Sequence, residues 1–199
     1  MQKLQIENED KRVKRSKRDL SNALDELLNK KNFDDISIQD ISDQAMVSKN
    51  TFYNNFLDKN ELLMYLFRRY SLEIYEKIEP LFDKSDDLEE ISKESLKYVI
   101  EYLSNNYKKF KKMIDNDRSK ALYWNFYSFI QEIVTFIFKS YKDQLPFDSP
   151  LEIISPFLAG GISSLIYSMF EGEKIYSEEE IYGYLEKIIS SRLLKIPEN

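Results

Sequence analysis

Residues 48–54 carry the side chains best suited to chemistry in this chain, and that chemistry is hydrogen bonding. Ser48 is a good helix N-cap, and Phe52 and Phe56, four residues apart, share one face of the helix that follows. The opposite face holds polar or hydroxyl-bearing side chains, namely Lys49, Asn50, Thr51, Tyr53 and Asn54. Such a face can simply be solvated surface, but a short helix of this kind also fits the DNA major groove, where hydrogen bonds read base edges.

A second capped helix precedes this one. Ser37 is placed as an N-cap, and Ile38, Ile41 and Ala45 recur at helical spacing, so one face of residues 38–45 is expected to be buried. Asp58 then caps a further helix start. Two short helices joined by a tight turn predict a helix-turn-helix, in which outward-facing N–H groups at the Ser37 and Ser48 caps suit phosphate binding.

The distribution of charge supports binding to a polyanion. The whole chain carries a formal net charge of −6, yet residues 1–60 are neutral overall. Within them, residues 11–18 (KRVKRSKR) place six cations in eight positions. A local basic patch on an acidic protein is typical of nucleic-acid contact. We therefore expect Lys14, Arg15 and Lys17 to meet DNA phosphates, the alternative being a solvated basic arm.

Composition argues against several classes of function. The 199 residues include no cysteine and no histidine, which excludes Ser–His and Cys–His catalysis, zinc sites built on those residues, and disulfides. We find no glycine-rich phosphate loop and no metal-ligand cluster, so neither enzyme activity nor a cofactor is expected. The first 20 residues lack the apolar core of a secretory signal, and a cytoplasmic location is expected.

A resemblance to a known family appears at the predicted helix-turn-helix. Residues 45–62 (AMVSKNTFYNNFLDKNEL) resemble the TetR-family signature AGVS-x-x-TFY-x-x-F-x-x-K-x-x-L. The matching positions are Thr51, Phe52, Tyr53, Phe56, Lys59 and Leu62. The resemblance implies a DNA-binding domain in which Tyr53 and Lys59 grip phosphates. Two positions depart from the pattern, because Met46 replaces the usual glycine of the turn and Asn55 a frequent histidine.

The remaining elements predict an all-α protein. All four glycines lie at or beyond position 160, and no hairpin signals occur. We expect about nine helices, arranged as a three-helix DNA-binding domain with its basic arm (1–58) and a helical-bundle regulatory and dimerisation domain (59–199). A helix over 59–80 joins the two, and Pro80 marks its end.

Aromatic residues on two later helices form a candidate effector site. They are Tyr98, Tyr102, Tyr123, Trp124, Phe126 and Tyr127. Aromatic residues at helical spacing are most often core, but buried tyrosine and tryptophan need polar partners, which a ligand can supply. The family resemblance implies an effector bound among these helices, and the surrounding acidity favours an apolar or cationic one.

The C-terminal part contains a candidate dimer interface. Residues 157–172 (FLAGGISSLIYSMFEG) are similar to a dimer-interface helix of the TetR subgroup that regulates dihydroxyacetone kinase genes. Two glycines in mid-helix each cost about 1 kcal/mol relative to alanine, which makes sense if another backbone approaches closely. The predicted interface residues are Phe157, Gly160, Gly161, Leu165, Ile181, Leu185 and Ile188. Residues 153–170 carry no charge, but their proline, glycines and serines favour an interface helix over a membrane span.

These features converge on a dimeric, ligand-responsive transcription regulator, most simply a repressor that binds a near-palindromic operator. Its expected partners are double-stranded DNA, a second copy of the chain and a small effector, with no membrane. Two alternatives stay open: a regulator acting by protein–protein contact, and a helical apolar-ligand-binding protein without DNA activity.

Overall fold

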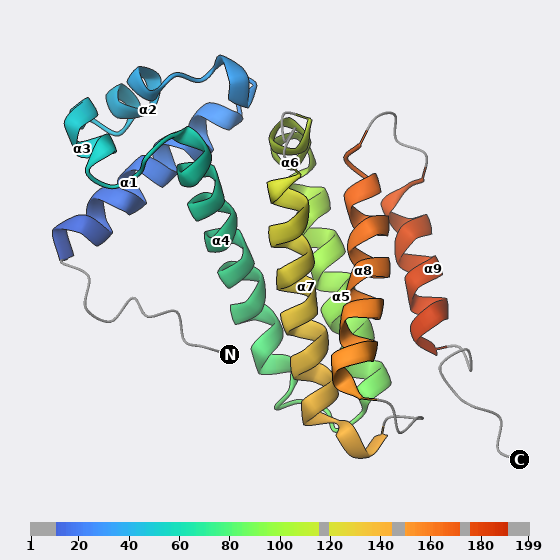
Figure 1. The fold of residues 1–199 in the computed structure, drawn as a ribbon. Coiled ribbons are helices and arrows are strands. Elements are labelled where there is room, and N and C mark those ends of the chain that lie inside the picture. The colour runs from blue at the N-terminus through green and yellow to red at the C-terminus, as the bar shows by residue number, and fades with distance from the viewer. Residues whose placement is uncertain (1–10, 116–119, 145–149, 172–175, 191–199) are drawn as a thin grey trace, which may run out of the picture. The chain divides into compact units, whose positions relative to one another are not determined.

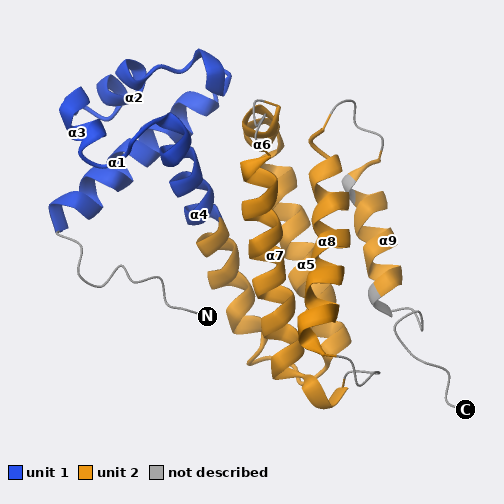
Figure 2. Ribbon diagram, viewed as in Figure 1, with its two compact units in different colours: residues 1–70 blue, residues 71–199 orange. Residues whose placement is uncertain are grey.

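The chain is helical throughout its described part, as its composition predicts. The computed structural model describes residues 11–115, 120–144, 150–171 and 176–190, in which nine α-helices and three short 3₁₀ helices occur and no strand (Figure 1). The chain divides into two compact units, residues 1–70 and 71–199 (Figure 2). Helix α4 (Lys59–Ile78) begins in the first unit and ends in the second.

The first unit is a small helical domain with an apolar core. It contains α1 (Lys11–Leu28), α2 (Ile38–Gln44), α3 (Lys49–Tyr53) and the first part of α4, with the 3₁₀ helix η1 (Phe33–Asp35) between α1 and α2. Side chains at helical spacing meet in the centre, where Leu20, Leu24, Ile41, Phe52 and Leu62 have no exposed surface. Phe33 of η1 is buried as well.

Two polar ties hold α4 to α1 in this unit. Arg69 Nη1 donates to Ser21 Oγ at 2.8 Å and to Asn22 Oδ1 at 2.9 Å. One residue further along α4, the hydroxyl of Tyr70 donates to the carboxylate of Asp25. The direction of α4 is therefore fixed by α1 within this unit.

The second unit is a helical bundle. It holds the rest of α4, then α5 (Leu88–Asn105), α6 (Tyr107–Ile114), α7 (Ala121–Ser140), α8 (Leu151–Ser168) and α9 (Glu178–Ser190). Helix α7 lies along α8, and α5 lies along α9 (Figure 1). Most apolar side chains of α7 are buried, but Trp124 is 60% exposed.

Helix α8 stands out by its apolar exposure. Among the described residues it is the one helix long and apolar enough to cross a membrane, a test that core helices of soluble proteins also pass. Only 28% of its residues are buried, so an almost uncharged helix turns much of its surface outward. The side chains of Ile153 and Phe157 are 63% and 73% exposed.

The turn between α2 and α3 is a Schellman motif, the usual way for a helix to end in a left-handed residue. The N–H of Val47 donates to the carbonyl of Ser42 at 2.9 Å, and that of Met46 to Asp43 at 3.1 Å. Met46 has φ = 54°, and its side chain is 91% exposed. The family glycine is therefore replaced by a residue that strains the backbone there and contributes no packing to the core.

We predict that Met46→Gly leaves the first unit as stable or makes it more stable, by up to about 1 kcal/mol, because glycine adopts positive φ without a steric penalty. Met46→Ala is the matched control, since it removes the same side chain but keeps the strain. Urea unfolding compares the three proteins. A clear loss of stability in the glycine variant alone would show that this turn does not need glycine.

Candidate DNA-binding site

A capping box starts α2 and holds it to the preceding loop. Ser37 Oγ accepts the backbone N–H of Asp40 at 3.1 Å, while the Ser37 N–H donates to Asp40 Oδ2 at 2.8 Å. Lys31 Nζ donates to the other carboxylate oxygen of Asp40 at 3.0 Å. These bonds, those of Ser37 first and that of Lys31 after them, hold the pKa of Asp40 far below its ordinary value. Sequence reasoning placed the Ser37 cap but not the lysine.

Helix α3 presents the polar face that the sequence predicts. Ser48 Oγ accepts the N–H of Thr51 at 3.1 Å and caps the helix, and Phe52 inserts into the core with no exposed surface. The predicted contact residues then fall outside the core: Lys49, Asn50, Tyr53 and Asn54 are exposed, and Thr51 is half-buried. The Thr51 hydroxyl lies 3.0 Å from that of Ser48, so these two groups already share a hydrogen bond.

Asn55, which replaces the frequent family histidine, is turned toward its own helix. Its Nδ2 donates to the carbonyl of Thr51 at 2.6 Å, and its side chain is partly buried. In this position the amide strengthens the end of α3.

The basic segment is part of a regular helix. Helix α1 carries it within Lys11–Leu28. Lys14 and Lys17 are half-buried, and Arg15 is exposed, with its Nε 3.6 Å from Asp19 Oδ2. A surface ion pair of this length contributes little, so Arg15 stays available to an anion.

Lys59 has a different role from the predicted one. Its ammonium group donates to three backbone carbonyls, those of Phe33 at 2.9 Å, Asp34 at 3.1 Å and Ile36 at 3.0 Å. It also lies 4.7 Å from the centroid of the Phe33 ring. All three N–H donors are therefore used inside the domain and leave none for a phosphate in this arrangement. The expected phosphate contact is replaced by a tie between the start of α4 and η1.

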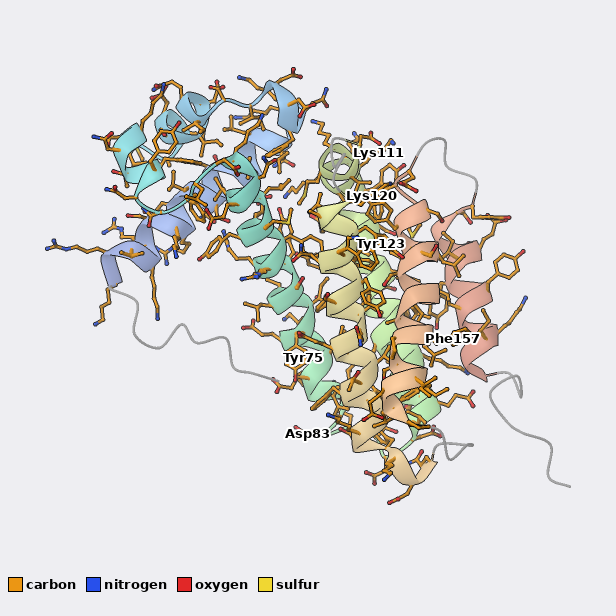
Figure 3. The ribbon with its side chains drawn as sticks, in the orientation of Figure 1. Tyr75, Asp83, Lys111, Lys120, Tyr123 and Phe157 are labelled. Carbon is orange, nitrogen blue, oxygen red and sulfur yellow. The ribbon has the colours of Figure 1, made fainter. Side chains whose placement is uncertain are left out.

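The aromatic residues of the predicted effector site fall into two sets. On α5, the Tyr98 and Tyr102 rings lie 6.4 Å apart, and Tyr102 donates to Glu73 Oε2 on α4 at 2.7 Å. Burial, and then the charge of Glu73, raise the pKa of Tyr98. On α7, Tyr123 (labelled in Figure 3) lies on the bundle, and its ring packs edge-on against that of Tyr167 of α8 with centroids 5.2 Å apart.

The other three members of that predicted site lie on different faces of α7. Phe126 is buried, whereas Tyr127 is half-buried. The ring of Tyr127 packs against the exposed Trp124 ring, with centroids 5.8 Å apart. The exposure of Trp124 does not fit the expectation that it lines an enclosed cavity. Among the described residues, no group of three aspartates, glutamates, histidines or cysteines could hold a metal ion.

The predicted dimer residues divide between surface and core. On α8, Phe157, Gly161 and Leu165 are exposed and Gly160 is half-buried. On α9, Ile188 is 39% exposed, but Ile181 and Leu185 are buried at 4% and 3%. Because α9 packs along α5, these two residues are part of the core of their own bundle and are not surface for a second chain. That part of the prediction is corrected.

Comparison with known proteins gives one family and one fold. Residues 16–66 match the family model described as bacterial regulatory proteins, tetR family. No curated protein matches the chain in sequence. Several solved structures match over almost its whole length, all at low sequence identity, so these likenesses establish the fold.

Three of these structures show how far the likeness extends. The Thermus thermophilus repressor FadR, solved with lauroyl-CoA, has a TM-score of 0.73 at 17% identity and covers 92% of this chain and 98% of its own. The dihydroxyacetone kinase operon activator DhaS has a TM-score of 0.64 at 18% identity, covering 91% and 98%. RolR, solved with resorcinol, has a TM-score of 0.69 at 14% identity, covering 91% and 90%.

The Asp40 capping box predicts a pH dependence of stability. Its folded pKa lies below its unfolded one, so this carboxylate stabilises the fold above the ordinary pKa of 3.8, and the contribution is lost as the pH falls further. Asp40→Asn should therefore destabilise the protein at pH 7, and the cost should begin to shrink only as the pH falls below 3.8, measured by urea unfolding from pH 7 down to pH 3. Asp34→Asn, which removes a nearby charge, is the control. A cost of Asp40→Asn that does not decline at all between pH 7 and pH 3 would contradict this role.

The Lys59 tie predicts a stability effect where a phosphate contact would give a binding effect. Lys59→Met keeps the apolar stem but leaves three carbonyls without their charged donor, so the free energy of unfolding should fall by about 2 kcal/mol. Lys77→Met, on an exposed lysine of the same helix, should change it by less than about 0.5 kcal/mol. An unchanged stability of Lys59→Met together with a lower salt dependence of DNA binding would restore the phosphate role.

Proposed function

We propose that this chain, whose residues 16–66 are a TetR-family N-terminal domain, is a homodimeric and ligand-responsive transcription regulator without enzyme activity. In this proposal it acts in the cytoplasm as a repressor and binds a near-palindromic operator. The observation that carries the proposal is α3, a capped helix anchored by Phe52 with four exposed polar side chains on its open face.

The base contacts are assigned to the N-terminal end of α3. Lys49 and Asn50 occupy its first turn and are exposed, which suits hydrogen bonds to base edges. Lysine pairs naturally with guanine and asparagine with adenine in the major groove. Tyr53, together with the α1 cations Lys14, Arg15 and Lys17, is assigned to phosphates, which fix position without reading sequence.

Dimerisation is assigned to the outer face of α8. A palindromic site requires two recognition helices about 34–36 Å apart, one turn of DNA, and hence two copies of the chain. In a protein of net charge −6, copies repel unless they meet on an uncharged face, and α8 supplies one over residues 153–170. A Cβ added at Gly161 would meet no atom within 4 Å, so the fold of one protomer does not require this glycine.

The effector is expected to act through α4, to which both units contribute. In the first unit Arg69 and Tyr70 tie this helix to α1. In the second unit Glu73 accepts from Tyr102 of α5, and the ring of Tyr75 packs against Phe136 of α7. A small apolar or cationic effector that shifts α5 or α7 would therefore displace α4. Coupling of this kind is reciprocal and typically amounts to about 1–3 kcal/mol.

Selection of bound fragments from the source genome tests the proposal directly. A regulator of this kind should enrich a near-palindromic sequence, bind it more weakly as salt rises, and release it when the effector is added. Enrichment of no sequence would favour a protein-contact regulator. Tight binding of a small ligand with no effect of DNA on its affinity would favour an apolar-ligand-binding protein.

We predict that the two kinds of DNA contact separate by substitution. Lys49→Ala or Asn50→Ala should relax preference at particular operator positions, because each base-edge hydrogen-bonding pair supplies about 1–3 kcal/mol of discrimination. Arg15→Ala should instead weaken binding to all sequences and lower the salt slope by about 0.9 for each phosphate that is no longer neutralised, doubled in a dimer. Binding assays over a panel of operator variants and salt concentrations measure both effects. The opposite pattern would contradict the assignment.

A further inference from the structure

Trp124 is the largest side chain exposed on the second unit. It lies in the first turn of α7 and is 60% exposed, although most apolar side chains of the same helix are buried. It is also the only tryptophan of the chain. An indole ring that leaves so much apolar surface in water is costly, and such rings are enriched at protein interfaces.

The surroundings of Trp124 connect it to the outer face of α8. Its ring packs edge-on against Tyr127, with centroids 5.8 Å apart. Tyr127 in turn reaches α8, since its Cε2 lies 3.9 Å from where a Cβ of Gly160 would be. Phe157 and Gly161, which neighbour Gly160 on the surface of α8, are exposed. Trp124, Tyr127 and this face of α8 therefore form one apolar surface.

The shape of this surface is suited to pairing with the same surface on a second copy of the chain. A two-fold interface brings the same patch together twice, so the patch must offer both projections and depressions. Phe157 and Trp124 project, at 73% and 60% exposure. Gly161 and the exposed Ser164 are small, and the position of Gly161 opens onto free space. Large rings and small residues thus lie on one surface, and the charges beside it, Lys120 and Glu171, are paired with each other.

We propose that Trp124 and Tyr127 of α7 extend the α8 interface and pack against a second copy of this chain, where the rings of each copy cover the small residues of the other. Trp124 is then a dimer contact and not an effector contact. The proposal rests on the dimer of the proposed function and adds to it a second helix and an aromatic anchor.

The fluorescence of the single tryptophan tests this without a label. The concentration of full-length protein is lowered from above to below the dimer dissociation constant, which is measured in parallel by sedimentation. Tryptophan emission and its quenching by acrylamide are recorded at each concentration. In the dimer Trp124 should emit at shorter wavelength and be quenched several-fold less than in the monomer. Phe157→Glu, which places like charges on the α8 face, provides a folded monomer as reference, and circular dichroism checks its helix content.

Substitution gives the second measurement. Trp124→Ala should raise the dimer dissociation constant by roughly 30-fold or more, as for the aromatic anchors of other interfaces. Tyr53→Ala, an exposed ring of the first unit, is the matched control and should leave that constant unchanged while weakening DNA binding.

The results of these experiments can refute the Trp124 contact without refuting the proposed dimeric regulator. A dimer in which Trp124 is quenched as strongly as in the monomer, or in which Trp124→Ala has no effect, overturns the inference and leaves the dimeric regulator standing. Protection of Trp124 only after lipid vesicles or an effector are added also overturns it. A chain that binds its operator but stays monomeric at all concentrations overturns both.

Discussion

The ammonium group of Lys59 joins parts of the first unit that are far apart in sequence. By donating to the carbonyls of Phe33, Asp34 and Ile36 it anchors the start of α4 on the loop between α1 and α2. The capping box at Ser37 follows at once and sets the direction of α2, and the Schellman turn at Met46 sets that of α3. The position of α3 therefore depends on these hydrogen bonds to the backbone, the last of which are made by one lysine.

The two units carry opposite kinds of surface, and this division suits two different partners. The first unit has a cluster of cations on α1 and polar side chains on α3, which suit a hydrated polyanion. Residues 61–199 carry the whole net charge of −6, yet α8 has no charged residue after Glu152, and Ile153, Phe157 and Leu165 are exposed on it. In the proposed dimer, like charges would keep the two copies apart elsewhere, so electrostatics and apolar burial would favour the same mode of association.

Local features were predictable from the sequence because their signals lie within a few residues. The caps at Ser37 and Ser48, the buried pair Phe52 and Phe56, and the all-helical fold follow from spacing and residue type. The Lys59 tie was not predictable, because it spans 23–26 positions and a family motif shows that a lysine is favoured without showing its partner.

Burial on the later helices was predictable only in part. Periodicity shows that Ile181 and Leu185 share an apolar face, but not whether α5 or a second chain covers it. The exposure of Trp124 was unpredictable for the same reason, because the sequence of an apolar helix does not show which of its sides other helices cover. Tertiary packing decides both cases, and neither is encoded in any short stretch of sequence.

The uninterrupted length of α4 has a geometric consequence. Its 20 residues contain neither glycine nor proline, and at 1.5 Å per residue they span about 30 Å. A rotation of about 6° about one end of such a rod moves the other end by about 3 Å, close to the 3.4 Å spacing of neighbouring base pairs. A tilt of a few degrees is therefore comparable, at the far end of α4, with one base-pair step, so the proposed coupling of effector and DNA would need no hinge within this helix.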